Sequence, residues 1–187
     1  MPIEKLRFAA FCAYLGSWLV LIIATVMGAL PQFRRSGATA FRMPLPVIGG
    51  TGLQIIAALG ITLTLGDSPL RPSTFELFAA LLLAPLSAAI FAWAQRSSPK
   101  YSEKETLVTS GPYQWVRHPM YLAFFAMLLA TGFLASSGPK LIFAAVLYLA
   151  GCEIRIAFEE SHLSHQFPTS YSNYRTRTPW RYLPGIR

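Results

Sequence analysis

The chain has 187 residues, of which 53% are hydrophobic and only 13% are charged. Soluble domains usually carry about 25% charged residues, so this composition argues against a soluble domain and indicates an integral membrane protein. The formal net charge of +8 is explained more simply by membrane topology than by a nucleic-acid site.

Three long apolar runs come first in the chain. Residues 8–33 and 43–66 carry no charge, and residues 72–95 carry one, Glu76. A membrane helix needs roughly 20 apolar residues, so each run is long enough to cross a bilayer. The first run is too long for a signal peptide and lacks a small-residue cleavage site, so we expect it to be retained. Glycines in the second run predict close helix packing. They are Gly49, Gly50, Gly52 and Gly60.

Two further apolar runs, 119–136 and 141–158, are separated by a short break at Ser137–Lys140. A break that short predicts a tight antiparallel hairpin of helices. We therefore predict an all-α integral membrane protein in which residues 1–187 form one membrane domain. It should have about five membrane helices, the fourth and fifth paired and the fifth only just long enough to span.

The basic residues predict the orientation of these helices. With five spans, twelve of the sixteen lie in segments on one side, and the other side holds only Lys5, Arg7, Arg71 and Lys140. Basic residues favour cytoplasmic segments, so we place the N-terminus outside and the C-terminal tail in the cytoplasm. Basic groups at that surface would also attract anionic lipid headgroups.

The two cysteines, Cys12 and Cys152, both lie in apolar runs. Their positions match neither a disulfide framework nor the ligand spacing of a zinc site. We therefore predict packing thiols and no metal site.

Polar residues gather in residues 97–119 and again from Glu153 to the C-terminus. The predicted hairpin brings the two segments to the same side of the membrane. In the second segment, Arg155, Glu159 and His162 share one helix face. A charge at membrane depth costs at least about 2.5–3.5 kcal/mol, so such groups usually pair or line a wet cavity. The alternative is that the helix has already left the membrane and shows a solvated charged face.

The first polar segment ends in TLVTSGPYQWVRHPMY, residues 106–121. Each residue of it has a structural explanation when taken singly. Gly111-Pro112 is typical of a turn, and Pro119 fits the first turn of a helix. His118 could cap that helix, and Arg117 could be a cytoplasmic anchor.

Taken together, however, the stretch closely resembles the signature of the isoprenylcysteine carboxyl methyltransferases. It also resembles the wider group of membrane methyltransferases that includes phospholipid N-methyltransferases. That pattern is Leu-Val, a Gly-x-Tyr turn, and Arg-His-Pro-x-Tyr at the entry to a membrane helix. A second signature follows here as Arg155, Glu159, Glu160, Phe167, Tyr171, Tyr174 and the basic tail RTRTPWRYLP. The resemblance covers roughly residues 96–187, and residues 1–95, the three N-terminal helices, match only in being hydrophobic.

The resemblance implies that residues 96–187 form a catalytic region that binds S-adenosyl-L-methionine and releases S-adenosyl-L-homocysteine. Glu159 would hold a polar part of this cofactor, and Arg155 would face the carboxylate of the methyl acceptor; these two are the candidate catalytic residues. The other candidate cofactor-binding residues are Leu107, Val108, Tyr113, His118, Pro119 and Tyr121. Weaker candidates are Ser98, Arg117 and Glu160.

The chain departs from the family pattern at a few positions. Glu105 stands where close eukaryotic relatives tend to have histidine. Ala123 and Pro168 each replace a glycine that is common in the family. The tail TPWRYLP also has a longer spacing than usual. We expect these departures to bear on which acceptor is used.

The function implied by the resemblance is methyl transfer to the carboxylate of an isoprenylcysteine-like or other small lipophilic acceptor that enters from the bilayer. A carboxylate is already ionised at neutral pH, so it needs no general base. An amine acceptor would need one, for example Glu160 or His162, and a thiol is a further alternative.

Two alternatives from other classes remain open. Membrane sterol reductases, which use NADPH, carry a related Arg-His-Pro-x-Tyr element, but those chains are much longer. The second alternative is a non-enzymatic scaffold or transport subunit, in which the charged groups only anchor the helices.

Overall fold

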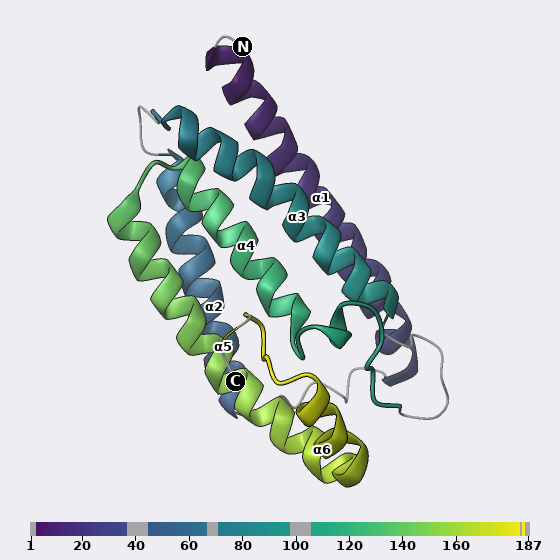
Figure 1. The fold of residues 1–187 in the computed structure, drawn as a ribbon. Coiled ribbons are helices and arrows are strands. Elements are labelled where there is room, and N and C mark those ends of the chain that lie inside the picture. Colours follow the sequence, from purple (N-terminus) through teal and green to yellow (C-terminus); the bar gives the residue numbers. More distant parts are fainter. Residues whose placement is uncertain (1–2, 37–44, 67–70, 98–105, 184, 186–187) are drawn as a thin grey trace.

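The computed structural model describes residues 3–36, 45–66, 71–97, 106–183 and 185 (Figure 1). Within these ranges the regular structure is entirely helical, which confirms the predicted all-α class. The long helices are α1 (Ile3–Ser36), α2 (Leu45–Leu63), α3 (Thr74–Ser97), α4 (Pro119–Leu134) and α5 (Gly138–Gln166). The shorter ones are η2 (Thr64–Gly66), η3 (Gly111–Gln114) and α6 (Pro168–Arg177).

Four helices, α1, α2, α3 and α5, have the length and apolar composition to cross a membrane. The predicted fifth span, α5, is one of these four and has 29 residues, whereas α4 has only 16, so the total of five spans stays a prediction. α5 continues through Arg155 and Glu159 to Gln166 because these charged side chains find partners inside the protein. α4 is bounded by Pro119 at its start and by Ser136, with a φ of 50°, just beyond its end.

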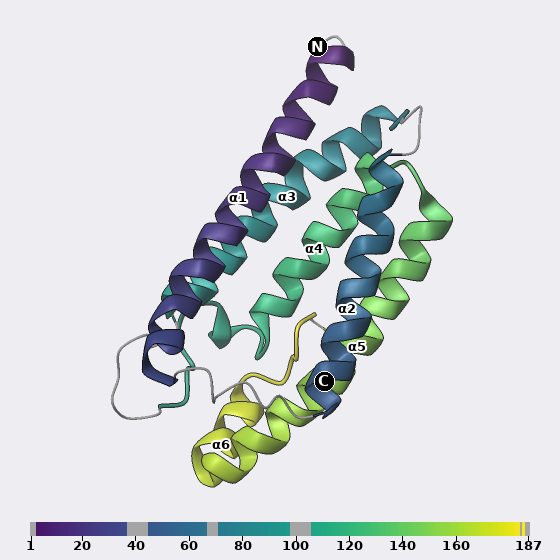
Figure 2. The same cartoon turned by 180° about the vertical axis from the view of Figure 1, so that it is seen from behind.

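The helices form two packed groups that meet at α4. α3 packs along α1 and α4, whereas α2 packs along α5. α4 and α5 are joined by residues 135–137 as the predicted hairpin. However, each packs more extensively on its other neighbour than on the other arm of the hairpin (Figures 1 and 2). One apolar core lies between α1, α3 and α4, and a second lies between α2, α4 and α5.

The start of α3 is fastened to the turn of this hairpin. The Ser73 backbone N–H donates to Glu76 Oε2 at 2.6 Å, and the Glu76 N–H donates to Ser73 Oγ at 3.3 Å. This reciprocal pair is a capping box, which satisfies two free N–H groups at the helix start. The Ser136 hydroxyl also donates to the Glu76 carboxylate at 3.2 Å. The single acidic residue of the third apolar run is therefore a structural tie.

α2 and α5 cross at two glycines with close backbone contact. A Cβ placed on Gly50 would lie 2.8 Å from the Gly151 carbonyl oxygen, and one on Gly151 would lie 2.6 Å from the Gly50 oxygen. The predicted close packing of the second helix is therefore right at Gly50. At Gly49, Gly52 and Gly60 no atom of the described residues lies within 4 Å of such a Cβ. Cys152 is buried beside this crossing, as expected for a packing thiol, whereas Cys12 is exposed on α1.

The C-terminal tail returns from α6 to the loop that precedes α4 (Figure 1). The Arg117 N–H donates to the Trp180 oxygen at 2.9 Å, and the His118 N–H donates to the Arg181 oxygen at 2.7 Å. This end of the bundle, with α6 and the tail, lies opposite the N-terminus and the hairpin turn (Figure 1). That it faces the cytoplasm stays a prediction, as does the division into residues 1–95 and a catalytic region 96–187.

Candidate functional site

A cavity of about 650 Å³ lies beside α4, between α1, α2 and α5, with residues 106–108, η3 and α6 at one end. Its volume is in the range usual for small-molecule sites. Side chains at that end are polar, among them Tyr113, His118 and Glu159. The other end is lined by apolar side chains of α1, α2 and α4. These include Trp18, Ile55, Ala58, Ile61, Met127 and Leu128.

The structure brings all the principal site residues predicted from the sequence into the wall of this cavity. They are Leu107, Val108, Tyr113, His118, Pro119, Tyr121, Arg155 and Glu159. Of the weaker candidates, Arg117 also lines the cavity, and Ser98 falls outside the described residues. Glu160 and His162 are not among the lining residues of the described chain, and His162 is exposed.

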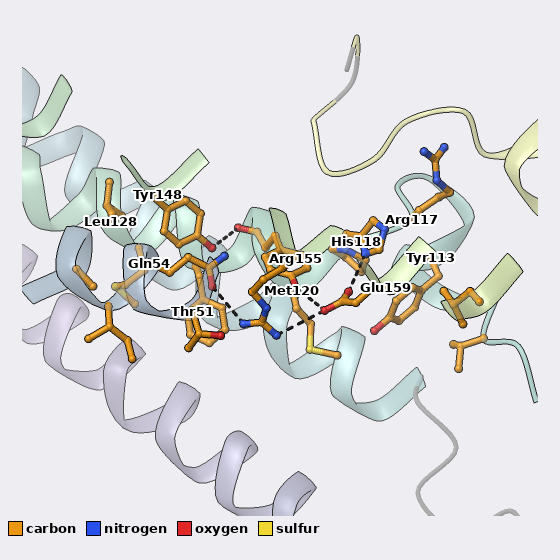
Figure 3. Close-up of a pocket in the computed structure, with 18 of the residues that line it drawn as sticks. Thr51, Gln54, Tyr113, Arg117, His118, Met120, Leu128, Tyr148, Arg155 and Glu159 are labelled. Atoms are coloured by element: carbon orange, nitrogen blue, oxygen red, sulfur yellow. Dashed lines mark hydrogen bonds and ion pairs between the residues drawn. The ribbon is translucent and has the colours of Figure 1, made fainter. Parts of the chain in front are cut away.

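Arg155 and Glu159 lie side by side at the polar end of the cavity (Figure 3). They lie one turn apart on α5, which puts both on the same helix face. Arg155 Nη2 lies 3.5 Å from Glu159 Oε1, and the guanidinium carbon lies 5.2 Å from the centre of the Tyr121 ring. The Tyr121 hydroxyl donates to the same Glu159 oxygen. The result is a cation held over an aromatic face, with a carboxylate beside it.

His118 lies between two carboxylates. Its Nδ1 is 3.3 Å from Glu159 Oε2, and its Nε2 is 3.4 Å from Glu160 Oε1. Burial lowers the pKa of His118, but the hydrogen bonds and negative charges of Glu159 and Glu160 outweigh this effect, so the pKa is raised. Because each ring nitrogen faces an acceptor, the protonated imidazolium fits this position best.

Glu160 belongs to a second cluster, behind the cavity wall. Arg117 Nε donates to Glu160 Oε1 at 2.8 Å, and Arg117 Nη1 donates to the carbonyl oxygens of Thr178 and Pro179 at 2.8 and 2.6 Å. The side chains of Arg117 and Glu160 are only 4% and 9% exposed. A buried ion pair persists only when its remaining donors are satisfied, and here the tail supplies those acceptors. We call Arg117, Glu160 and residues 178–181 the tail clamp.

Two further hydrogen bonds fix the end of the tail to α5. Arg181 Nη1 donates to Glu153 Oε2 at 2.6 Å, and the Tyr182 hydroxyl donates to Glu153 Oε1 at 2.8 Å. The Tyr182 side chain is buried in the α2–α5 core. The tail is thus held against both α4 and α5, and it closes the polar end of the bundle.

The turn that carries Tyr113 is fixed by contacts with α6 and with the end of α3. Tyr174 of α6 donates from its hydroxyl to the Tyr113 carbonyl oxygen at 2.7 Å. Gly111 opens η3 with a φ of +62°, and a Cβ there would overlap the side chain of Ser97. A left-handed backbone without room for a side chain requires glycine. The Gly-Pro pair predicted as a turn therefore places Tyr113 at the cavity.

Comparison with known proteins matches the part of the chain that carries α4 and α5, but the family-model match ends before the tail. Residues 87–170 match the family model described as phospholipid methyltransferase. The protein-S-isoprenylcysteine O-methyltransferase of Schizosaccharomyces pombe is 38% identical over 81 residues, which is 43% of this chain and 34% of that protein. The proteins of the same name from Xenopus laevis and Homo sapiens are 35% and 34% identical over 86 residues, 46% of this chain and 30% of each relative.

The matched segment is thus similar both to the phospholipid methyltransferase model and to the protein-S-isoprenylcysteine O-methyltransferases. The alignments cover about a third of the length of these curated relatives. They confirm the family resemblance read from the Arg-His-Pro-x-Tyr and Arg-x-x-x-Glu-Glu patterns.

The departures from the methyltransferase family pattern lie away from the cavity where the structure describes them. Ala123 is fully buried against α1 and α3 in the first apolar core. Pro168 is the first residue of α6, where a missing N–H does no harm. Glu105 falls outside the described residues. The two described substitutions therefore act on packing and helix entry rather than on the cavity wall.

Several cavity residues of α1 and α2 were missed by the sequence reasoning, because the family resemblance covers only residues 96–187. The most polar of them is Gln54, whose Oε1 accepts from Arg155 Nη1 at 3.2 Å (Figure 3). Gln54 carries the one amide side chain in the uncharged run 43–66. A lone amide inside a membrane helix marks a position that needs a polar partner, and this signal could have found it.

Proposed function

We propose that this protein transfers a methyl group from S-adenosyl-L-methionine to the carboxylate of a lipophilic acceptor inside the membrane. The observation that carries the proposal is one continuous cavity with a charged end, at Arg155 and Glu159, and an apolar end between α1, α2 and α4. The names of the relatives, isoprenylcysteine O-methyltransferases, support the same reaction class. An isoprenylcysteine-like molecule has both a carboxylate and a long apolar chain.

The polar end fits the cofactor by its donor set. The Glu159 side chain is 35% exposed toward the cavity, so its carboxylate can accept from an ammonium group of the cofactor. Leu107 and Val108 offer backbone groups, and Tyr113 offers an aromatic face. When bound, S-adenosyl-L-methionine supplies an electrophilic methyl group on a sulfonium, whose sulfur keeps the electron pair of the broken bond. S-adenosyl-L-homocysteine would then leave through the polar end of the cavity.

Arg155 is the residue we assign to the acceptor carboxylate. Its Nε is buried and makes no hydrogen bond with any part of the chain that the structure describes. A guanidinium can bind a carboxylate through two parallel hydrogen bonds, which fixes the orientation of the attacking oxygen. Positioning of this kind contributes about 7–11 kcal/mol toward lowering a reaction barrier. The cavity therefore holds a cation for the acceptor and an anion for the cofactor side by side.

The apolar end suits the hydrocarbon part of the acceptor. The Thr131 hydroxyl there is occupied by Met127 O at 2.9 Å and by the Tyr14 hydroxyl at 3.1 Å, so it presents no free polar group to the cavity. The surrounding wall is mainly aliphatic and aromatic, with the hydroxyl of Thr62 as a further polar group. Burial of a prenyl or acyl chain would contribute about 25 cal/mol for each Å² of apolar surface removed from water.

The carboxylate is favoured over an amine acceptor by the position of the possible bases. An amine must lose a proton, and Glu160 is engaged by Arg117 behind the cavity wall. His162 is exposed on α5. A carboxylate needs no such base. The prenylated acceptor would enter from the bilayer, and with the tail in the cytoplasm the cofactor would enter from the cytoplasmic side.

The test uses the full chain purified in detergent. We expect S-adenosyl-L-homocysteine to bind in a calorimetric titration, and labelled methyl groups to pass to prenylcysteine or another lipophilic carboxylate but not to matched amines. A parallel titration with NADPH examines the reductase alternative. Folded protein that binds NADPH, or that binds neither compound, would overturn the proposal.

A further inference from the structure

Gln54 of α2 bridges two residues of α5 at the edge of the cavity (Figure 3). Its Nε2 donates to Cys152 Sγ at 3.2 Å, and its Oε1 accepts from Arg155 Nη1 at 3.2 Å. The thiol contact leaves the amide oxygen facing the guanidinium. Because an amide has one donor end and one acceptor end, this arrangement gives Arg155 an acceptor without adding a charge.

The glycine crossing of α2 and α5 is what lets Gln54 reach Arg155. A Cβ on Gly50 would lie 2.6 Å from Arg155 Cγ, and a Cβ on Gly151 would lie 2.9 Å from Gln54 Cγ. Any side chain at either glycine would therefore push apart the two helices or the two side chains. Gly50 lies one turn before Gln54, and Gly151 lies one turn before Arg155. The Gly50–Gly151 contact and the Gln54–Arg155 hydrogen bond therefore lie in the same α2–α5 interface.

Arg155 has few other restraints. Its Nη2 contact with Glu159 is long, at 3.5 Å, its Nε has no partner in the described residues, and its guanidinium lies over the Tyr121 ring. The ring contact fixes the height of the guanidinium but not its rotation in its own plane. Gln54 and Glu159 hold its two Nη atoms from opposite sides (Figure 3), and together they set that rotation.

We propose that Gln54 is a positioning residue that sets the in-plane orientation of the Arg155 guanidinium for the methyl acceptor. This inference rests on the proposed function, because it assumes that Arg155 binds the acceptor. It extends the functional site to α2, a helix outside the family match. It also assigns a purpose to the Gly50–Gly151 contact, which keeps the bridge short.

The first test compares Gln54→Leu with Gln95→Leu. Gln95 is a matched control, since it is a half-buried glutamine of α3 whose Nε2 also faces a sulfur atom, Met120 Sδ, and not Arg155. In Gln54→Leu we expect kcat/KM for a prenylcysteine acceptor to fall at least about tenfold, as for the loss of one hydrogen bond to a charged group. The Kd for S-adenosyl-L-homocysteine should stay within about twofold, since Glu159 is retained. Gln95→Leu should change neither value.

A double-mutant cycle distinguishes positioning from a purely structural role. If Gln54 acts through Arg155, Gln54→Leu should lower kcat/KM no further in an Arg155→Ala background. A structural role would give the same loss in both backgrounds. Gly50→Ala should reproduce the loss seen for Gln54→Leu, whereas Gly49→Ala, with no described atom within 4 Å of its Cβ, should be neutral.

A second readout needs no acceptor. In protein labelled with ¹⁵N-arginine, hindered rotation should give Arg155 separate Nη signals, identified by their absence in Arg155→Ala. We expect them to merge in Gln54→Leu and to persist in Gln95→Leu. Persistence in Gln54→Leu, or unchanged kcat/KM, would overturn the positioning role alone. Wild-type protein that binds no S-adenosyl-L-homocysteine and transfers no methyl group would overturn the proposed function, and this inference with it.

Discussion

Glu159 and Glu160 are neighbours in the chain but belong to different parts of the molecule. Glu159 faces the cavity, with a side chain that is 35% exposed, and contacts Arg155, Tyr121 and His118. Glu160 is 9% exposed and is engaged by Arg117 of the tail clamp. Successive residues on an α-helix point about 100° apart, so one carboxylate can serve the cavity while the next holds the fold.

This difference explains why two successive glutamates occur in the second signature. The same residue type occurs twice because two arginines must be matched: Arg155 lies beside Glu159, and Arg117 binds Glu160 and the tail. His118 is the one group in the described residues whose two ring nitrogens contact both carboxylates. We infer that it couples the stability of the tail clamp to the charge of the cavity.

The largest effect is expected from removing Arg117, which tests the structural role of Glu160. Arg117→Met leaves Glu160 buried without its main partner, and breaking a buried ion pair in this way costs about 3–5 kcal/mol. We expect a large fall in the thermal midpoint of the detergent-solubilised protein, with S-adenosyl-L-homocysteine binding lost as the tail comes away. In the double variant Arg117→Met/Glu160→Met, much of the stability should return. A midpoint near that of the wild type for Arg117→Met would contradict the structural role of the clamp.

The two glutamates can be compared directly by Glu159→Gln and Glu160→Gln. Loss of a charged hydrogen bond carries about 1.5–3 kcal/mol, or roughly ten- to a hundredfold in affinity. Glu159→Gln should weaken S-adenosyl-L-homocysteine binding by that factor in calorimetry, with a nearly unchanged thermal midpoint. Glu160→Gln should do the reverse. Two variants with the same profile would show that the glutamates share one role.

Much of the site was predictable from the sequence because its residues lie in two local patterns. Pro119 at a helix start and Gly111 at a turn both carry strong backbone preferences, and the structure uses them as expected. The spacing of Arg155 and Glu159 needed only the helix period to place both on one face. The matching of the five helices to five apolar runs follows from composition alone.

The rest depended on contacts between distant segments. Nothing local distinguishes Glu160 from Glu159, because what separates them is Arg117, 43 residues away. His162 shares a face with Arg155 in the pattern, yet it is exposed, whereas the next residue, Leu163, lines the cavity. Gln54 lies 101 residues from Arg155, and the splayed α4–α5 hairpin that lets α2 pack along α5 has no sequence signature.

His118 allows the coupling of the two clusters to be tested by pH. Its pKa is raised in the folded protein because hydrogen bonds and charges of Glu159 and Glu160 outweigh the effect of burial. The stability that it contributes is therefore complete below the unfolded pKa of about 6.5 and is lost as the pH rises through the higher folded pKa. We expect the thermal midpoint to fall as the pH rises above about 6.5, and the fall to be smaller in His118→Gln. An identical pH profile for both proteins would refute the coupling.

The smallest expected effect belongs to the ion pair between Arg181 and Glu153. Its N–O distance is 2.6 Å, but the two side chains are 27% and 43% exposed, so water and salt screen the pair. Such pairs contribute about 0.2–1 kcal/mol. Glu153→Gln should therefore lower the thermal midpoint only slightly, and the difference from the wild type should shrink in about 1 M salt, where the Debye length falls to about 3 Å. The loss caused by Arg117→Met should persist in the same salt, because that pair is buried. A large, salt-independent loss for Glu153→Gln would mean that Glu153, rather than Arg117, holds the tail. The structural role assigned to Glu160 would then be contradicted.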